Sequence, residues 1–220
     1  MKTILDGVLR FERDVVPRER PLLARLAAGQ NPEALFITCA DSRIVPSLIT
    51  QTKPGDLFIC RNAGNIVPPY EEVTGGVSAT IEYAVRVLNV QHIVVCGHSD
   101  CGVMKALLHP EKVESLRAVS AWLRHGDTAR LVVQENHPGL EGRELTDMLA
   151  QQNALAQIAN LRTHPGVAAR EAAGKLTLHA WFYDVETGHV LVHDANRRRF
   201  VALVSDAPEQ AVAVEGGVHV

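Results

Sequence analysis

Short apolar runs separated by polar segments mark the first half of the chain. Three of these runs, at 35–37, 57–60 and 93–96, each lead into a polar segment. Uninterrupted runs of this length are typical of strands buried on both faces of a parallel sheet. Between the second and third runs, residues 75–90 begin with two glycines and then carry apolar residues at helical spacing. The pattern therefore predicts strands that alternate with helices.

The second half of the chain continues with longer helical segments. Residues 113–174 have mostly helical spacing, broken at 135–145, and residues 176–194 predict two strands joined by a Glu-Thr-Gly turn. This alternation favours an α/β fold with a mostly parallel central β-sheet flanked by helices. Ligands bind such sheets at the carboxyl ends of the strands, so polar residues there are candidates for a site.

The two ends of the chain differ in pattern. Near the N-terminus, residues 3–28 are predicted to be helical, with a rough apolar stripe that is interrupted at Pro17 and Pro21. This arm is expected to pack on the rest of the chain or on a partner subunit. The C-terminal tail has no clear period. The predicted boundaries are 1–220 for a single domain, 1–30 for the N-terminal helical arm and 207–220 for the tail.

Composition narrows the possible partners. The 220 residues are 46% hydrophobic with a net charge of −3, and the one tight basic cluster, at 197–199, is typical of a solvated surface. We therefore expect no nucleic-acid partner. Charged residues break the N-terminal apolar runs, and no run is as long as a membrane span, which predicts a cytoplasmic protein with no membrane partner. In that reducing compartment, cysteines favour metal or catalytic roles over disulfides.

A His-x-x-Cys pair follows the third predicted strand. The spacing of His98 and Cys101 lets both side chains reach one ion, and Cys39, at the end of the first strand, is the natural third ligand. Three thiolate or imidazole ligands are typical of catalytic zinc, which keeps a fourth position open. Taken alone, Cys39 is also compatible with a small core residue. Cys60 and Cys96 lie in apolar runs and are interpreted as core, and the remaining histidines form no second set at ligand spacing.

Asp41 lies two residues after Cys39, and Arg43 follows two residues later. A carboxylate beside zinc can coordinate the metal or accept a hydrogen bond from a water molecule on it. An arginine partner would keep that carboxylate ionised and fix its direction. An ordinary salt bridge within a loop is the alternative interpretation of the same pair.

Three motifs in order carry a family resemblance. They are C-A-D-S-R at 39–43, R-N-A-G-N at 61–65 and G-H-S-D-C-G at 97–102. Over roughly residues 1–195 the chain resembles the β-class carbonic anhydrases. It looks closest to the bacterial branch associated with cyanate metabolism, which is similar to the plant chloroplast enzymes. The resemblance implies one zinc ion per subunit held by Cys39, His98 and Cys101, with an Asp41–Arg43 dyad beside it.

The resemblance also implies a substrate pocket. Plant-like members use a glutamine, a phenylalanine and a tyrosine that match Gln30, Phe58 and Tyr83, contributed by one or both subunits at a dimer interface. Gly102 matches a position whose backbone N–H meets bicarbonate. The implied oligomer is a homodimer at least, and often a homotetramer.

The implied reaction is the reversible hydration of carbon dioxide to bicarbonate and a proton by zinc-bound hydroxide. Zinc lowers the pKa of its water from about 15.7 towards roughly 7. Some members close at low pH, when the aspartate takes the fourth zinc position, and these carry a tryptophan where this chain has Phe36. We therefore expect Asp41 to stay with Arg43, as in the permanently open type.

Two alternatives remain open from the residues. A zinc hydrolase of a carbon dioxide analogue, such as carbonyl sulfide or carbon disulfide, would use the same metal ligands with a different pocket. A zinc-binding regulatory module would have a closed site with four ligands. Gln30, Phe58 and Tyr83 argue against the module, because a structural zinc needs none of them.

Overall fold

A computed structural model describes residues 1–70 and 75–203 of the chain. The predicted tail at 207–220 lies outside the described residues. The strands are β1 (Ala34–Cys39), β2 (Leu57–Asn62), β3 (His92–His98), β4 (Thr177–Tyr183), β5 (Val190–Asp194) and β6 (Arg199–Ala202). The α-helices are α1 (Lys2–Arg10), α2 (Val16–Ala27), α3 (Pro46–Thr50), α4 (Gly76–Arg86), α5 (Gly102–Leu108), α6 (Arg117–Leu123), α7 (Asp127–Asn136), α8 (Gly142–Thr163) and α9 (Pro165–Ala172).

The six strands form one sheet in the order β2-β1-β3-β4-β5-β6. The strands β2, β1, β3 and β4 are parallel, and β5 and β6 extend the sheet in antiparallel fashion. The predicted α/β fold with a mostly parallel sheet is confirmed. The sequence pattern did not predict β6, whose first residue, Arg199, ends the basic cluster that we had interpreted only as solvated surface.

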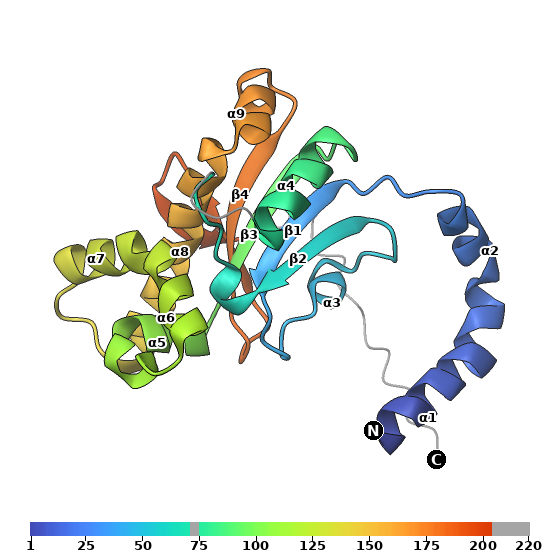
Figure 1. The fold of residues 1–220 in the computed structure, drawn as a ribbon, viewed down its shortest axis with the longest axis horizontal. Coiled ribbons are helices and arrows are strands. Elements are labelled where there is room, and N and C mark those ends of the chain that lie inside the picture. Colours follow the sequence, from blue (N-terminus) through green and yellow to red (C-terminus); the bar gives the residue numbers. More distant parts are fainter. Residues whose placement is uncertain (71–74, 204–220) are drawn as a thin grey trace, which may run out of the picture.

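Alternate residues of β1 face the two sides of the sheet, as strand geometry requires. Leu35 and Ile37 are fully buried in a core with residues of α4, α8 and α9, which cover that side (Figure 1). On the other side, Phe36 packs edge-to-face against Trp181, with ring centroids 5.8 Å apart. Both rings line a cavity of about 670 Å³ near the amino ends of the strands.

The N-terminal arm extends away from the sheet (Figure 1). A π-helical turn at Phe11–Val15 joins α1 to α2, so the helical path is continuous. The predicted N-terminal helical arm is confirmed, and the prolines that interrupt its apolar stripe do not end the helix: Pro17 lies in the first turn of α2, where its missing N–H needs no partner, and α2 also continues through Pro21. No residue of either helix is buried. Within the described residues, no helix is both long enough and apolar enough to cross a membrane.

Candidate metal centre

The predicted ligands Cys39, His98 and Cys101 meet at the carboxyl edge of the sheet. Cys39 and His98 are the last residues of the adjacent parallel strands β1 and β3, and Cys101 directly precedes α5. Their ligand atoms all lie within 4.8 Å of one another, and the three residues are 4%, 0% and 1% exposed. Parallel strands bring their ends to one edge, so the fold assembles ligands that are far apart in the sequence.

The hydrogen bonding of His98 fixes which ring nitrogen is free. Its Nδ1 lies 2.9 Å from the carbonyl oxygen of Ser99, and because a carbonyl only accepts, Nδ1 carries the proton. The buried Nε2 has no hydrogen-bond partner in the described part of the chain. A buried nitrogen without a partner is costly unless something binds it. The imidazole therefore fits a metal, with Ser99 orienting the ring from behind.

The two thiols influence one another's protonation. A hydrogen bond from Cys101 is the largest cause that lowers the pKa of Cys39, and the same contact raises the pKa of Cys101. The backbone N–H of Gly64 also donates to Cys39 Sγ at 3.4 Å. Gly64 has φ +78°, and a Cβ there would lie 2.6 Å from a methyl group of Val103, so this donor position requires glycine. A divalent cation would stabilise both thiolates, so the donor set fits zinc.

Asp41 and Arg43 form the predicted ion pair beside the ligands. Arg43 Nη2 lies 2.8 Å from Asp41 Oδ2, and Arg43 Nε lies 3.0 Å from Asp41 Oδ1. This bidentate contact holds the pKa of the Asp41 carboxyl well below its usual range. Asp41 Oδ2 is 3.9 Å from His98 Nε2, so one carboxylate oxygen lies at the edge of the ligand cluster.

Two charged residues at the site were not predicted from the sequence. Arg61 donates to the carbonyl oxygens of Asp41 at 2.6 Å and Cys39 at 3.2 Å, which holds the loop after β1. Asp100 Oδ2 accepts from Arg43 Nη1 at 3.1 Å. Both residues lie inside the quoted motifs. Their place in these motifs indicates that they belong to the site, but the motifs do not show which atoms the two side chains contact.

The fold brings Phe58 and Tyr83 together, with ring centroids 6.0 Å apart. It does not bring them to the metal ligands of the same chain. Phe58 is in register with Leu35 on β1, four residues before Cys39, which is about 13 Å along a strand. Gln30 is exposed in the connection between α2 and β1.

Gly102 follows Cys101 and begins α5. An added Cβ would meet no atom within 4 Å, so one side of its backbone is open. Gly102 also lines an apolar cavity of about 350 Å³ together with Ala63, Val103 and Trp122. A small apolar molecule could therefore approach the backbone next to the second thiolate.

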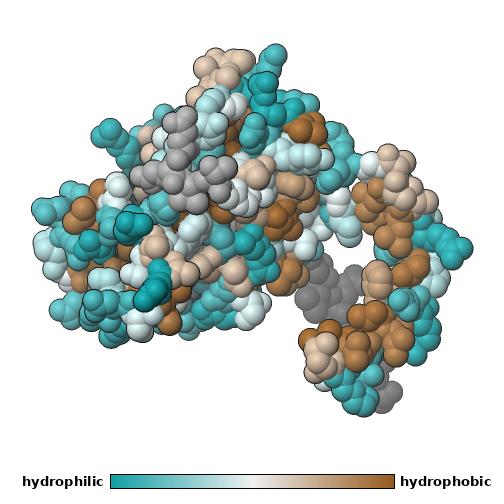
Figure 2. All heavy atoms as spheres, in the orientation of Figure 1, coloured by the Kyte–Doolittle hydropathy of each residue, from teal (hydrophilic) through white to brown (hydrophobic). Residues whose placement is uncertain are grey.

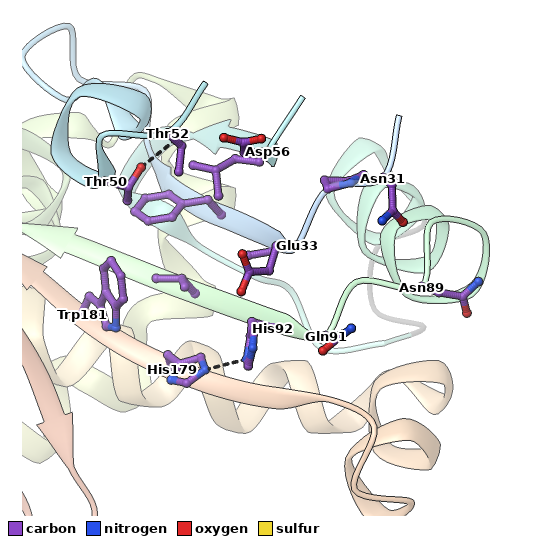
Figure 3. A pocket seen from close by; sticks show the side chains of 15 residues that line it. Asn31, Glu33, Thr50, Thr52, Asp56, Asn89, Gln91, His92, His179 and Trp181 are labelled. Carbon is purple, nitrogen blue, oxygen red and sulfur yellow. Dashed lines mark hydrogen bonds between the residues drawn. The ribbon is translucent and has the colours of Figure 1, made fainter. Parts of the chain in front are cut away.

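The larger cavity lies near the amino ends of the strands (Figure 3), and its lining includes none of the three metal ligands. Its polar lining includes His92 and His179, whose Nδ1 and Nε2 atoms lie 3.2 Å apart. These two histidines are 87 residues apart in the sequence, so spacing could not reveal the contact. Among the described residues, only Cys39, His98 and Cys101 group three potential ligands closely enough for one ion.

A mostly parallel sheet with a buried Cys2His cluster at its carboxyl edge defines a metal-dependent α/β enzyme. Comparisons with known proteins narrow this class. Residues 34–190 match the family described as carbonic anhydrase. A carbonic anhydrase of Pseudomonas aeruginosa is 50% identical over 217 residues, covering 99% of this chain and 98% of that protein. Carbonic anhydrase 1 of Escherichia coli O157:H7 is 47% identical, covering 94% of each chain.

Solved structures agree with the sequence relatives. The β-carbonic anhydrase CcaA superposes with a TM-score of 0.90 at 43% identity, covering 92% of this chain and 99% of that one. A tetrameric β-carbonic anhydrase of Sordaria macrospora has a TM-score of 0.76 at 31% identity, covering 87% and 95%. The chain belongs to the β-class carbonic anhydrases, zinc-dependent lyases that interconvert carbon dioxide and bicarbonate.

Proposed function

We propose that this chain hydrates carbon dioxide at the Cys39–His98–Cys101 centre with Asp41 and Arg43 as its catalytic dyad. The observation that carries the proposal is the free, buried Nε2 of His98 inside a two-thiol cluster, with an ionised carboxylate 3.9 Å away. Zinc, when bound, supplies the Lewis acidity that makes water nucleophilic near neutral pH.

The residues of the chain have distinct proposed roles in this reaction. The ionised carboxylate of Asp41 accepts a hydrogen bond from the nucleophile and so orients it towards carbon. Arg43 keeps Asp41 ionised and prevents it from turning towards the metal. Phe36, rather than tryptophan, supports the permanently open arrangement. The backbone N–H of Gly102 is proposed to meet bicarbonate, because that side of its backbone is open.

Gln30, Phe58 and Tyr83 are proposed to line the substrate pocket of a partner subunit. The register of Phe58, about 13 Å from the ligand edge of its own sheet, supports a role in the partner's site. Tyr83 is 46% exposed and its ring contacts that of the half-buried Phe58, so the Tyr83 ring is accessible for such a role. Carbon dioxide is small and apolar, and an aromatic wall suits it.

The oligomer is proposed to be a homodimer at least, with a tetramer as its further assembly. The exposed apolar side chains of α1 and its π-helical turn support this, because they face solvent in the single chain (Figure 2). The Sordaria relative is described as tetrameric. A cytoplasmic location is proposed from the four free cysteines, and membership of the cyanate-associated and plant-like branch from Gln30, Phe58 and Tyr83.

Stopped-flow carbon dioxide hydration across pH, on protein of measured zinc content, tests the function. We expect turnover in proportion to bound zinc. Carbonyl sulfide, assayed on the same samples, tests the alternative hydrolase, which the relatives do not favour. Zinc-loaded protein that turns over carbonyl sulfide but leaves carbon dioxide hydration at the uncatalysed rate would contradict the proposal.

A further inference from the structure

We propose that Asp100 is a positioning residue for the hydration reaction, because it anchors the guanidinium of Arg43 that fixes the carboxylate of Asp41. The inference rests on the proposed roles of Asp41 and Arg43. The two loops concerned follow β1 and β3, and each carries part of the metal-ligand set. Asp100 joins them through contacts to Arg43.

Arg43 needs a second anchor. Its side chain is 41% exposed, and Asp41 lies only two residues before it on the same loop. A flexible arginine held only by a neighbour on its own loop can move together with that neighbour, since arginine has many accessible rotamers. Arg61 holds the backbone of Asp41, so a contact from a different segment to the Arg43 guanidinium would fix the other half of the dyad.

Asp100 provides that contact through two acceptors. Its Oδ2 accepts from Arg43 Nη1 at 3.1 Å, and its carbonyl oxygen lies 3.3 Å from Arg43 Nη2. The same Nη2 donates at 2.8 Å to Asp41 Oδ2, the carboxylate oxygen that lies 3.9 Å from His98 Nε2. The anchored nitrogen thus binds the oxygen nearest the metal ligands. A displacement of the Arg43 guanidinium would remove the hydrogen bond to that oxygen, whereas Asp41 Oδ1 would still accept from the backbone N–H of Arg43 at 3.0 Å.

Asp100 is itself held from two directions. Its Oδ1 accepts from Lys105 on α5, and its backbone N–H donates at 2.9 Å to Asp147 on α8. Its φ of +56° is left-handed, a region that aspartate and asparagine enter more readily than most residues. Asn at this position therefore keeps the backbone and the side-chain shape but removes the charge.

The test is a double-mutant cycle of Asp100→Asn and Arg43→Ala, with kcat, KM and zinc content measured for each protein. For a partly exposed ion pair we expect Asp100→Asn to lower kcat by about two- to fivefold, with KM and zinc content unchanged. In the Arg43→Ala background the same change is expected to have no further effect. The absence of a further effect in that background would show that Asp100 acts through Arg43 and has no general structural role. Asp100→Gly, which also tolerates the left-handed backbone, is expected to lower kcat at least as much.

A matched control exists on α7. Asp127 pairs with Arg130 at 3.0 Å, and its side chain is 46% exposed, as is that of Asp100. Asp127→Asn is expected to leave kcat unchanged. Wild-type kcat in Asp100→Asn, an equal loss in both backgrounds, or a loss that tracks lost zinc would each overturn the inference. Full activity of Arg43→Ala would instead overturn the proposed dyad, and the inference with it.

Discussion

The carboxyl edge of the sheet is buried within one chain, whereas the two helices of the N-terminal arm bury no residue in that chain. At the edge, Cys39, His98 and Cys101 are buried and lie within 4.8 Å of one another. In the arm, Ile4 and Leu9 are 63% and 62% exposed, and no residue of α1 is buried. One chain therefore builds its own metal-ligand set but leaves the apolar face of its arm in solvent. The difference separates the metal-ligand set, which one chain builds, from the proposed subunit contact of the arm, which would need a second chain.

The largest expected effect is at the buried edge. Cys39→Ser removes a ligand that the chain cannot replace, so we expect loss of zinc and a fall of hydration to the uncatalysed rate. Zinc analysis together with stopped-flow hydration measures both. Cys60→Ser is the matched control, because Cys60 is buried but lies in the core rather than in the ligand cluster. Hydration that continues in a zinc-free Cys39→Ser protein would refute the proposed site.

The arm should respond differently, through assembly rather than metal binding. Val8 and Phe11 are each 48% exposed. If a partner buries them, Val8→Asp with Phe11→Asp should raise the subunit dissociation constant by at least about a hundredfold. Sedimentation velocity over a range of concentrations measures this shift. Zinc content is expected to stay unchanged, which is the contrast with Cys39→Ser.

Leu131→Asp provides a control for that experiment. Leu131 is 52% exposed on α7, so the change adds a charge of the same kind to the body rather than to the arm. We expect it to leave the dissociation constant unchanged. An arm variant that sediments as the wild-type protein does would show that the arm has no part in assembly.

The next effect concerns the dyad at the same edge. Arg43→Met is expected to keep zinc but to lower activity about 10- to 100-fold, as is typical when a residue that orients a metal site is lost. Arg43 lowers the pKa of Asp41, so Asp41 is ionised above that lowered pKa and becomes protonated as the pH falls through it. In the variant the pKa of Asp41 returns towards about 3.9, so this carboxyl is protonated at a higher pH than in the wild-type protein. The water on zinc, with a pKa of roughly 7, sets the acid limit of activity, so NMR titration of the Asp41 carboxyl is the measurement that follows this shift. An unchanged pKa of Asp41 in the zinc-loaded variant would argue against this role.

Local hydrophobic patterns were sufficient to predict the parallel strands and the edge of the sheet that carries the candidate site. The ends of β1 and β3 were predicted from their apolar runs, and with them the edge where Cys39 and His98 meet. Strand ends are local features, and parallel packing aligns them. The short strand β6 was missed because four residues beside a basic cluster give too little pattern for a prediction.

Contacts between distant segments were not predictable in this way. Arg43 and Asp100 are 57 residues apart, and His92 and His179 are 87 residues apart. Their meeting depends on strand register and loop conformation, which a single sequence does not encode in its spacing. The helical arm itself was predicted, and its continuity past the prolines has a local cause. Proline is compatible with the first turn of a helix, and an exposed helix can continue past Pro21 without leaving a buried polar group unpaired.

The smallest effect tests whether the edge and the aromatic pair of one chain serve the same site. Tyr83→Ala should keep zinc and lower activity about two- to tenfold, the range for loss of one aromatic contact.

Mixing Tyr83→Ala protein with Cys39→Ser protein then shows whether Tyr83 serves the site of its own chain or that of the partner. If Tyr83 serves the partner's site, a mixed dimer places an intact ligand set opposite an intact Tyr83, and activity rises after subunit exchange. If Tyr83 serves its own chain, the only zinc-loaded site in the mixed dimer still lacks the ring, and activity does not rise. Exchange of Tyr83→Ala with itself sets the baseline, because in that dimer every site lacks the ring under either arrangement.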